Sequence, residues 1–315
     1  MAQTFTIYFH RDFDGAGSAA ILGDYLIQRG GHPAERLRFR SLGFEVKERW
    51  TRIRLRRPCA VLDFLYHPDA DWWVDHHVTS FLTEAWRESF RPGPTRVWDL
   101  SFPSCCSLMA AALQRAPHRY RNPAYDELAR WGDVIDAAQF ESVEQVLRCD
   151  HPALQINLAL QLHENPRFLS LLARELMGRP LAQVAELPFV RRAFRYAFER
   201  QEQSIAEFRR RSRYLRGVVQ FDMRRARHPY LRFVPYFLYP SARFVVGLFA
   251  RNGHHEVSVG SNPWLPFRGP NIGALCARYG GGGREQVGGI TLRSSAEALA
   301  AAREISDLLR SQPAP

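Results

Sequence analysis

Carboxylate and imidazole side chains recur in four separate stretches of the first half of this 315-residue chain. The stretches are His10-Arg-Asp12-Phe-Asp14-Gly-Ala-Gly-Ser, then Asp63, then Asp75-His76-His77, and finally Asp133 with Asp136. Together they offer more ligands than one metal ion needs. Two divalent cations bound about 3.5–4 Å apart repel each other and need a bridging anion such as a carboxylate. The four stretches therefore predict a two-metal site that hydrolyses phosphoesters.

The place of each ligand along the chain indicates its task. Asp63 stands alone at the end of an apolar run, where its carboxylate can bridge two ions. His76 and His77 are consecutive and can face different partners, one a metal ion and the other a substrate phosphate. Asp133 and Asp136 are three residues apart near the end of a predicted helix, and each offers a further carboxylate.

The segment that begins at His10 is predicted to be an extended loop. Alternate residues of an extended chain point the same way, so His10, Asp12 and Asp14 are expected to project together. Gly15 and Gly17 follow, and a residue without a side chain lets the backbone come close to a substrate.

Hydrophobic patterning predicts that strands alternate with helices around these residues. We expect strands at residues 5–9, 36–42, 59–64, 71–77 and 96–99, and helices at residues 19–29, 104–114 and 125–138. This alternation is typical of an α/β fold with a mostly parallel sheet and flanking helices. Ligands of such sheets bind beyond the carboxyl ends of the strands. Because His10, Asp63 and Asp75 lie at predicted strand ends, one rim of the sheet is expected to carry the site.

The second half of the chain changes character twice. Residues 150–216 have a helical pattern, which ends in an arginine-rich amphipathic stretch at residues 189–216. Beyond it we expect strands at residues 218–221, 231–239, 243–251, 256–260 and 290–292, and helices at residues 271–279 and 295–311. The sequence thus predicts three parts, which are a catalytic domain at residues 1–165, a helical connector at 166–216 and a smaller C-terminal α/β domain at 217–315.

Composition limits the partners and the compartment. The net charge is +11 and Lys47 is the only lysine, so nearly all of the positive charge is arginine. Arginine suits phosphate oxygens, which favours a polyanionic partner, although a compositional bias toward arginine explains the lysine deficit equally well. Five cysteines without a CxxC pair argue against a disulfide framework or a zinc site and favour the cytoplasm. The first residues are expected to form a strand rather than a signal peptide, and no apolar run is long enough to cross a membrane.

The ordered motifs resemble those of the DHH phosphoesterase family. The glycine-rich segment at residues 280–289 resembles the motif of the DHH-associated C-terminal domain. The resemblance implies that His10, Asp12 and Asp63 hold one ion and that Asp14, Asp63, His76 and Asp136 hold a second. Mn²⁺ is the expected metal, with Mg²⁺ as the alternative. His77 would lie near the scissile phosphate, and Asp75 would orient the histidines. Asp136 is preferred to Asp133 because Phe140 stands four residues after it, as an apolar residue does in the family.

The C-terminal domain is expected to bind the substrate. The family usually has a histidine after the glycine run, and Arg284 stands in its place here. Arg284 can bind phosphate as a permanent cation, with Gly281, Gly282, Gly283 and Asn262 beside it. The expected substrates are short single-stranded RNA or DNA oligonucleotides or small nucleotides, as for nano-RNases that also act on 3′-phosphoadenosine 5′-phosphate (pAp). An exopolyphosphatase-like or other phosphomonoesterase and a non-catalytic nucleotide-binding regulatory protein are the alternatives. A homodimer is compatible with the sequence.

Overall fold

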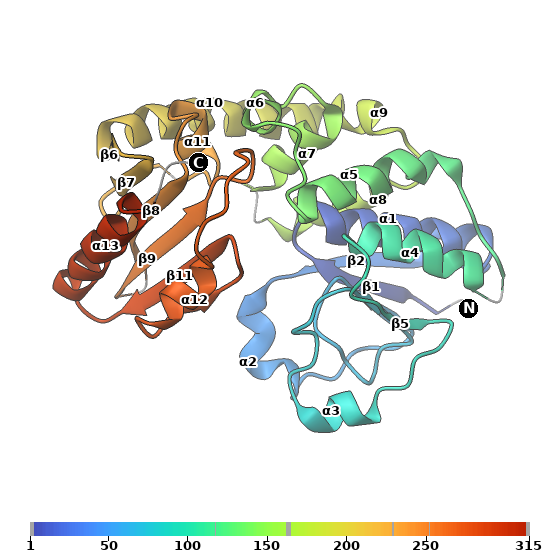
Figure 1. The fold of residues 1–315 in the computed structure, drawn as a ribbon. Helices are drawn as coiled ribbons and strands as arrows, with labels where there is room; N and C mark the ends of the chain where they lie inside the picture. The colour runs from blue at the N-terminus through green and yellow to red at the C-terminus, as the bar shows by residue number, and fades with distance from the viewer. Residues whose placement is uncertain (1–2, 117, 162–164, 229, 252, 313–315) are drawn as a thin grey trace. The chain divides into compact units, whose positions relative to one another are not determined.

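The computed structural model describes residues 3–116, 118–161, 165–228, 230–251 and 253–312. The chain divides into two compact units, and Figure 1 shows the elements of each. Unit 1 contains Met1–Phe140 and Cys149–Ala197, and unit 2 contains Glu141–Arg148 and Phe198–Pro315. The helices predicted as a separate connector do not form a unit of their own, because the division between the units falls inside one of them.

Unit 1 is built on a five-stranded sheet in the order β2-β1-β3-β4-β5, and every neighbouring pair is parallel. The mostly parallel sheet that the alternating pattern predicts is therefore confirmed. Its strands are β1 (Phe5–His10), β2 (Leu37–Leu42), β3 (Cys59–Leu62), β4 (Trp72–Asp75) and β5 (Arg96–Trp98). Parallel strands need crossover connections, and helices supply several of them.

Several helices of unit 1 pack around α1, which is mostly buried because most of its residues are apolar or small. Helix α1 contacts β1, α4, α5 and α8. The helices are α1 (Phe13–Gln28), α2 (Lys47–Trp50), α3 (Glu84–Ser89), α4 (Cys105–Arg115), α5 (Asp126–Asp136), α7 (Pro152–Gln161), α8 (Pro166–Glu175) and α9 (Leu181–Ala185). Short 3₁₀ turns occur at η1 (Ala34–Arg36), η2 (Phe44–Val46) and η3 (Pro123–Tyr125). The other face of the sheet is covered by a cluster of aromatic side chains around Trp50, Tyr66 and Trp73.

Unit 2 contains a six-stranded sheet in the order β10-β11-β9-β8-β7-β6, in which only the pair of β7 and β8 is parallel. Its strands are β6 (Ser212–Leu215), β7 (Val218–Asp222), β8 (Phe244–Arg251), β9 (His254–Ser261), β10 (Gly282–Gly283) and β11 (Val287–Leu292). Its helices are α6 (Val143–Arg148), α11 (Val234–Leu238), α12 (Ile272–Ala277) and α13 (Ser295–Arg310), and α10 (Pro188–Arg211) begins in unit 1 and ends here.

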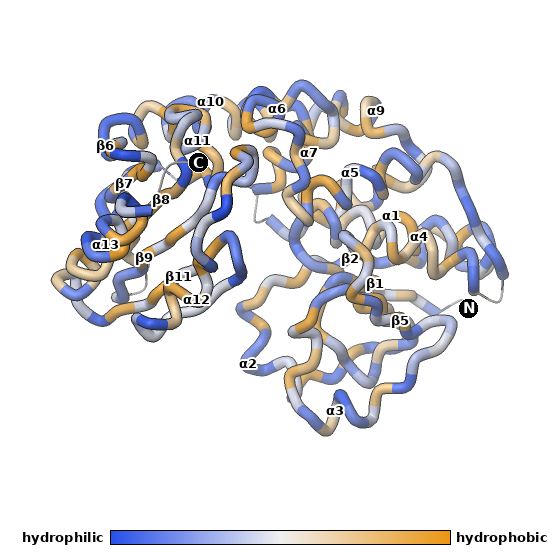
Figure 2. The backbone as a smooth tube through the Cα atoms, in the orientation of Figure 1, coloured by the Kyte–Doolittle hydropathy of each residue, from blue (hydrophilic) through white to orange (hydrophobic). Residues whose placement is uncertain are grey.

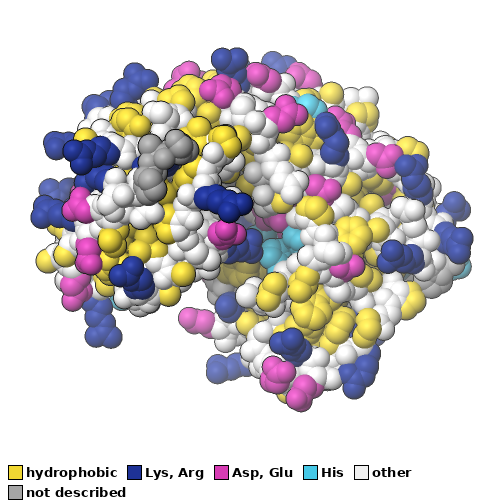
Figure 3. Space-filling view, viewed as in Figure 1, with side chains coloured by type: hydrophobic (Ala, Val, Ile, Leu, Met, Phe, Trp, Pro, Cys, Tyr) yellow, Lys and Arg dark blue, Asp and Glu magenta, His cyan; other side chains and the backbone are white. Residues whose placement is uncertain are grey.

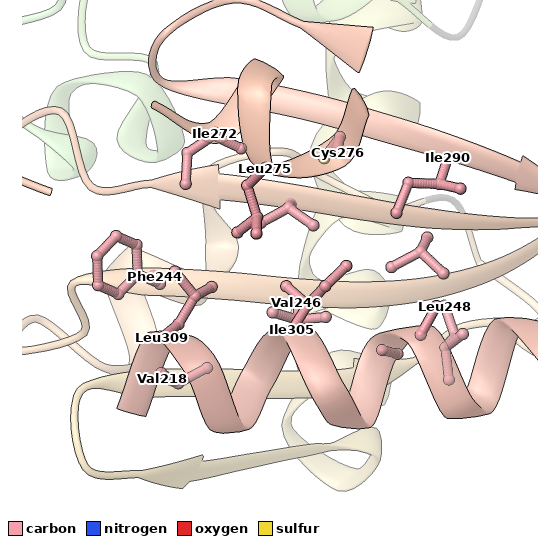
Figure 4. Close-up of a cluster of buried hydrophobic side chains, with 14 of the residues drawn as sticks. Val218, Phe244, Val246, Leu248, Ile272, Leu275, Cys276, Ile290, Ile305 and Leu309 are labelled. Atoms are coloured by element: carbon pink, nitrogen blue, oxygen red, sulfur yellow. The ribbon is translucent and has the colours of Figure 1, made fainter. Parts of the chain in front are cut away.

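The core of unit 2 forms where α13 crosses the sheet. Figure 4 shows Ile305 and Leu309 of this helix directed at Val218, Phe244 and Val246 of the strands. The residues of β8 are nearly all apolar and form one of the hydrophobic stretches in Figure 2, because this strand is covered on both faces. A full capping box at Ser294 and Glu297 fixes the start of α13.

Two sequence-based assignments in this half are wrong. Residues 231–239, predicted as a strand, contain the short helix α11, because burial of Val234 and Tyr236 in a shared core outweighs the β-rich composition. The predicted helix at 189–216 ends at Arg211, and Ser212–Leu215 is the edge strand β6. Arg216 and Gly217 adopt positive φ and form the tight turn that pairs β6 with β7.

Two surface and hydropathy features bear on the partners of the protein. On the face drawn in Figure 3, arginine side chains are dispersed over both units and do not gather in one patch. None of the helices within the described residues is long and apolar enough to cross a membrane.

Candidate metal centre

The predicted ligands meet at one rim of the unit 1 sheet. His10 is the last residue of β1, Asp63 directly follows β3, and Asp75 is the last residue of β4. Because β1, β3 and β4 are adjacent and parallel, their carboxyl ends lie side by side. The rim position expected from the strand pattern is therefore what the structure has.

Asp12 and Asp14 reach this rim in a different way from the one predicted. The segment after His10 is not an extended loop, because α1 begins at Phe13. Asp12 is the N-cap, and its Oδ1 accepts a hydrogen bond of 2.9 Å from the backbone N–H of Gly15. Asp14 lies in the first turn and is buried. The helix start, rather than alternation along a loop, brings the two carboxylates together.

The two glycines of this motif allow close packing, and a role for them in the approach of a substrate stays a prediction. A Cβ at Gly15 would collide with the backbone of His10, so only glycine lets α1 start this close to the end of β1. A Cβ at Gly17 would lie 2.5 Å from Sγ of Cys106 on α4. Both positions hold the ligand-bearing helix against its neighbours.

Asp14 is held by the N-terminus of α4, which the sequence analysis did not foresee. The backbone N–H groups of Cys105 and Cys106 donate to its two carboxylate oxygens at 2.6 and 2.7 Å. These groups lack partners within the helix and carry its positive end, so they stabilise a negative charge. Burial nevertheless raises the pKa of Asp14, and the nearby carboxylates of Asp63 and Asp136 raise it further.

Asp63 lies between the two sides of the site. Its φ of 53° is in the left-handed region, which residues other than glycine adopt uncommonly and aspartate more readily than most. Only 2% of the residue is exposed, and neither carboxylate oxygen has a hydrogen-bond partner. Oδ2 lies 3.6 Å from Nδ1 of His10, and Oδ1 lies 3.6 Å from Nε2 of His76. A buried carboxylate with two bare oxygens requires cations to compensate it.

The donor atoms form three overlapping groups among the described residues, and the atoms of each group lie within 4.8 Å of one another. The groups are His10 with Asp12 and Asp63, Asp14 with His76 and Asp136, and Asp63 with His76 and His77. Carboxylate oxygens with a minority of imidazole nitrogens suit hard divalent cations such as Mn²⁺ and Mg²⁺. The unpartnered oxygens of Asp63 and the unpartnered Nε2 of His76 fit such ions directly.

His76 is oriented toward the second group by its other ring nitrogen. Nδ1 lies 3.1 Å from the carbonyl oxygen of Phe102, so it carries the proton and donates. Nε2 is left facing Asp14 at 3.6 Å and Asp136 at 3.4 Å. A backbone carbonyl that fixes the tautomer is a common support for a metal-binding histidine.

His77 belongs to a separate hydrogen-bonded chain. Its Nδ1 lies 2.9 Å from Oδ1 of Asp75, and the other oxygen of Asp75 accepts from the hydroxyl of Ser80 at 2.5 Å. The hydrogen bond with Asp75 raises the pKa of His77, against an opposing effect of burial. The His77 side chain is 41% exposed, so its Nε2 edge is accessible while Nδ1 is held.

The buried carboxylates and imidazoles of the site shift one another's pKa values because they lie close together. Burial lowers the pKa of His10, but the carboxylates of Asp12 and Asp63 outweigh this effect and raise it to about 11. Burial also opposes the positive charge on His76, and Asp63 and Asp14 raise its pKa to about 9. Burial and the charge of Asp63 raise the pKa of Asp136 to about 6. Metal binding would displace the histidine protons, since a ligand must be deprotonated.

Asp133 is separated from the ligand groups by a different role. Its Oδ1 accepts a hydrogen bond of 2.6 Å from Ser104, the N-cap of α4, and it belongs to none of the three groups found within the described residues. Asp136, one turn further along α5, belongs to the second group. The preference for Asp136 agrees with this geometry.

The chain is similar to known proteins in its fold, and not in its sequence. Neither a protein-family model nor a curated protein sequence matches the chain. Among solved structures, it is similar to PggH of Vibrio cholerae, a pGpG-specific phosphodiesterase, with a TM-score of 0.73 and 16% identity over 99% of this chain and 100% of that one. It is also similar to the DHH domain of a member of a ribosomal protein family, with a TM-score of 0.59 and 14% identity over 98% of this chain and 87% of that one.

The chain has the DHH fold. RecJ of Thermus thermophilus, solved in complex with Mn²⁺, shares it with a TM-score of 0.56 and 17% identity over 99% of this chain and 53% of RecJ. The chain thus spans about half the length of RecJ. The resemblance that the ordered motifs predicted is confirmed at the level of the fold.

The glycine-rich segment of this DHH-fold protein folds as a hairpin. Gly282 and Gly283 form β10, which pairs with β11 at Gly288 and Gly289. A Cβ at Gly281 or Gly283 would collide with the backbone of the facing strand. The first N–H groups of α12 donate to the carbonyl oxygens of Arg284 and Glu285 at 2.8 Å. The run is thus explained by close backbone packing, and a role for it in binding phosphate stays a prediction.

The other two predicted substrate-binding residues, Arg284 and Asn262, differ in how exposed they are. Arg284 is exposed, as a phosphate-binding cation must be. Asn262 is buried, and its amide is used inside unit 2, where Nδ2 donates to the carbonyl oxygen of Ala242 at 2.8 Å and Oδ1 accepts from Trp264 N–H at 2.9 Å. This geometry argues against Asn262 as a substrate ligand, and sequence alone gave no signal of its burial.

Proposed function

We propose that this protein is a two-metal phosphodiesterase that hydrolyses short oligonucleotides or small nucleotide phosphoesters. The observation that carries the proposal is the buried carboxylate of Asp63, whose two unpartnered oxygens face His10 on one side and His76 on the other. A carboxylate so placed has no structural task that the fold explains. Bridging two cations is the task that suits it.

The two ions would be held by residues of unit 1 alone. His10, Asp12 and Asp63 would bind one, and Asp14, His76 and Asp136 would bind the other together with Asp63. Such ions supply a readily deprotonated water and neutralise the charge that develops on phosphate oxygens. Mn²⁺ is the proposed metal because imidazole shifts the preference of an oxygen-rich site from Mg²⁺ toward Mn²⁺. The Mn²⁺ in the RecJ structure of similar fold supports this choice.

His77 is proposed to act on the substrate. Because Asp75 holds Nδ1, the accessible Nε2 edge can donate a hydrogen bond to a phosphoryl oxygen or a proton to the leaving oxygen. Asp75 and Ser80 restrict the ring to one orientation, which lowers the entropic cost of reaching the transition state. We assign Arg284 to phosphate binding, since its exposed, planar guanidinium presents paired N–H donors that match phosphate oxygens.

A substrate screen with metal-stripped protein tests the proposal. Release of products is measured after adding Mn²⁺ or Mg²⁺, with di- to pentanucleotides, pAp, cyclic dinucleotides and inorganic polyphosphate as substrates. We expect Mn²⁺-dependent cleavage of the short oligonucleotides. Cleavage of polyphosphate alone would favour the exopolyphosphatase-like alternative, and nucleotide binding without turnover would favour the regulatory one.

Asp75→Asn provides the matched variant for this screen. Asp75 belongs to none of the ligand groups found in the described residues, so Mn²⁺ binding should persist while the orientation and charge of His77 are lost. We expect kcat to fall about 10²-fold or more, the usual contribution of a positioned acid or base. Undiminished activity in this variant would assign the hydrolysis to a contaminant or to another site.

A further inference from the structure

Phe44 is an exposed aromatic side chain at the same rim as the metal ligands. It follows β2, whose last residue, Leu42, pairs in register with His10 at the end of β1. Its ring centroid lies 5.1 Å from that of His10, yet 60% of the residue is exposed. Leaving a phenylalanine this open forfeits most of the stabilisation that its burial would give. The ring thus offers an open apolar face beside a candidate metal ligand.

The inner side of Phe44 rests on a rigid support. Its ring centroid lies 5.4 Å from that of Phe64, which directly follows Asp63 and is buried. Phe64 in turn packs edge to face against the buried Trp50 at 5.2 Å. The exposed ring is thus backed by two layers of buried aromatic side chains. Phe64 directly follows one ligand candidate, Asp63, and its ring centroid lies 6.1 Å from that of another, His10.

The backbone that carries Phe44 is also fixed. Glu45, its neighbour, forms an ion pair with Arg11, which directly follows His10. A Cβ at Gly43 would collide with the Arg11 guanidinium, so glycine at this position lets the arginine lie across the turn. The turn after β2 is therefore linked by an ion pair to the residue that follows β1.

We infer that Phe44 is a stacking platform for a nucleobase of the substrate. This inference rests on the proposed function. It adds a residue that would make the protein bind a phosphoester that carries a nucleobase in preference to one that does not. A phosphodiester at the group formed by His10, Asp12 and Asp63 has a nucleoside within reach of a ring 5.1 Å from His10. A flat, apolar face is what a base of any identity stacks on. The ring offers no hydrogen-bond donor or acceptor, so it distinguishes a base from no base, and not one base from another.

The test compares a dinucleotide with the matched dinucleotide in which one nucleotide or the other is abasic. The measured quantity is the ratio of kcat/KM for the complete substrate to that for each abasic substrate, in the full chain with Mn²⁺. Phe44→Leu keeps the apolar contact with His10 and removes the aromatic face. We expect the ratio for one of the two abasic partners to fall about 10- to 100-fold, the worth of one stacked base. Phe44→Trp should restore it.

Controls separate stacking from other roles of the ring. Tyr214→Leu removes an exposed aromatic side chain of β6 in unit 2 and should leave the ratio as in the wild type. Equal losses on complete and abasic substrates in Phe44→Leu would overturn the inference and assign Phe44 to positioning His10. An unchanged ratio would overturn it as well. If the wild-type protein cleaves neither these dinucleotides nor any other nucleotide substrate of the screen, the proposed function fails instead, which is a distinct result.

Discussion

Asp63→Asn tests the central geometry, because one carboxylate is proposed to serve both ions. The substitution keeps the size of the side chain and removes its charge. Since Oδ1 and Oδ2 lie 3.6 Å from His76 and His10 respectively, both ligand groups should lose affinity together. A 100-fold loss of affinity corresponds to about 2.7 kcal/mol.

The effect is read as metal-dependent stability. An ion at about 100 times its dissociation constant stabilises the folded protein by about 2.7 kcal/mol. For a unit of this size that raises Tm by roughly 5–10 °C. We expect thermal unfolding with Mn²⁺ and with EDTA to differ by this amount in the wild type and to coincide in Asp63→Asn. In EDTA the variant should be at least as stable as the wild type, since it relieves a buried charge among other carboxylates.

Asp133→Asn is the matched control for this experiment. Asp133 lies close to the site on α5, but its carboxylate is bonded to Ser104 and not to the ligand groups. This variant should keep the Mn²⁺-dependent rise in Tm. The reasoning is refuted if Asp63→Asn retains the full rise, or if Asp133→Asn loses it.

Two further predictions concern packing and pH. Gly15→Ala should destabilise unit 1 by about 1–3 kcal/mol, because the added Cβ collides with the backbone of His10, and it should weaken Mn²⁺ binding in a titration. Glu207 is buried, which opposes its charge, but hydrogen bonds from Arg227 N–H, from His228 and from Arg211 outweigh this and lower its pKa to about 2. A lowered pKa stabilises the folded state above the ordinary pKa near 4.5, and this stability is lost as pH falls toward 2. Glu207→Gln should therefore cost roughly 1–2 kcal/mol in urea unfolding at pH 7, and a difference that did not shrink between pH 5 and pH 2 would contradict this account.

Much of the site could be predicted from the sequence because it depends on local rules. Apolar runs that end in His10, Asp63 and Asp75 predict parallel strands, and parallel strands place their carboxyl ends at one rim. The spacing and order of the candidate ligands along the chain predicted that they form a two-metal site. No contact between distant segments had to be known for this step.

Contacts between distant segments decided the remainder. Asp14 accepts hydrogen bonds from backbone N–H groups of α4, about 90 residues away in sequence. Because the donors belong to the main chain, the side-chain types of Cys105 and Cys106 could not predict them. Composition likewise predicted a strand at residues 231–239, but α11 forms there. Packing in a shared core outweighs the intrinsic preference of these residues for a strand.

The candidate ligands, and the edge of the sheet at which they gather, could be predicted from the sequence alone. The tertiary structure decided which oxygen faces which imidazole, that Asn262 is buried, and that Phe44 stands open beside His10. The physical reason is range, because the positions of strands follow from periodicity along the chain, whereas strand order, side-chain orientation and exposure depend on atoms that only folding brings together.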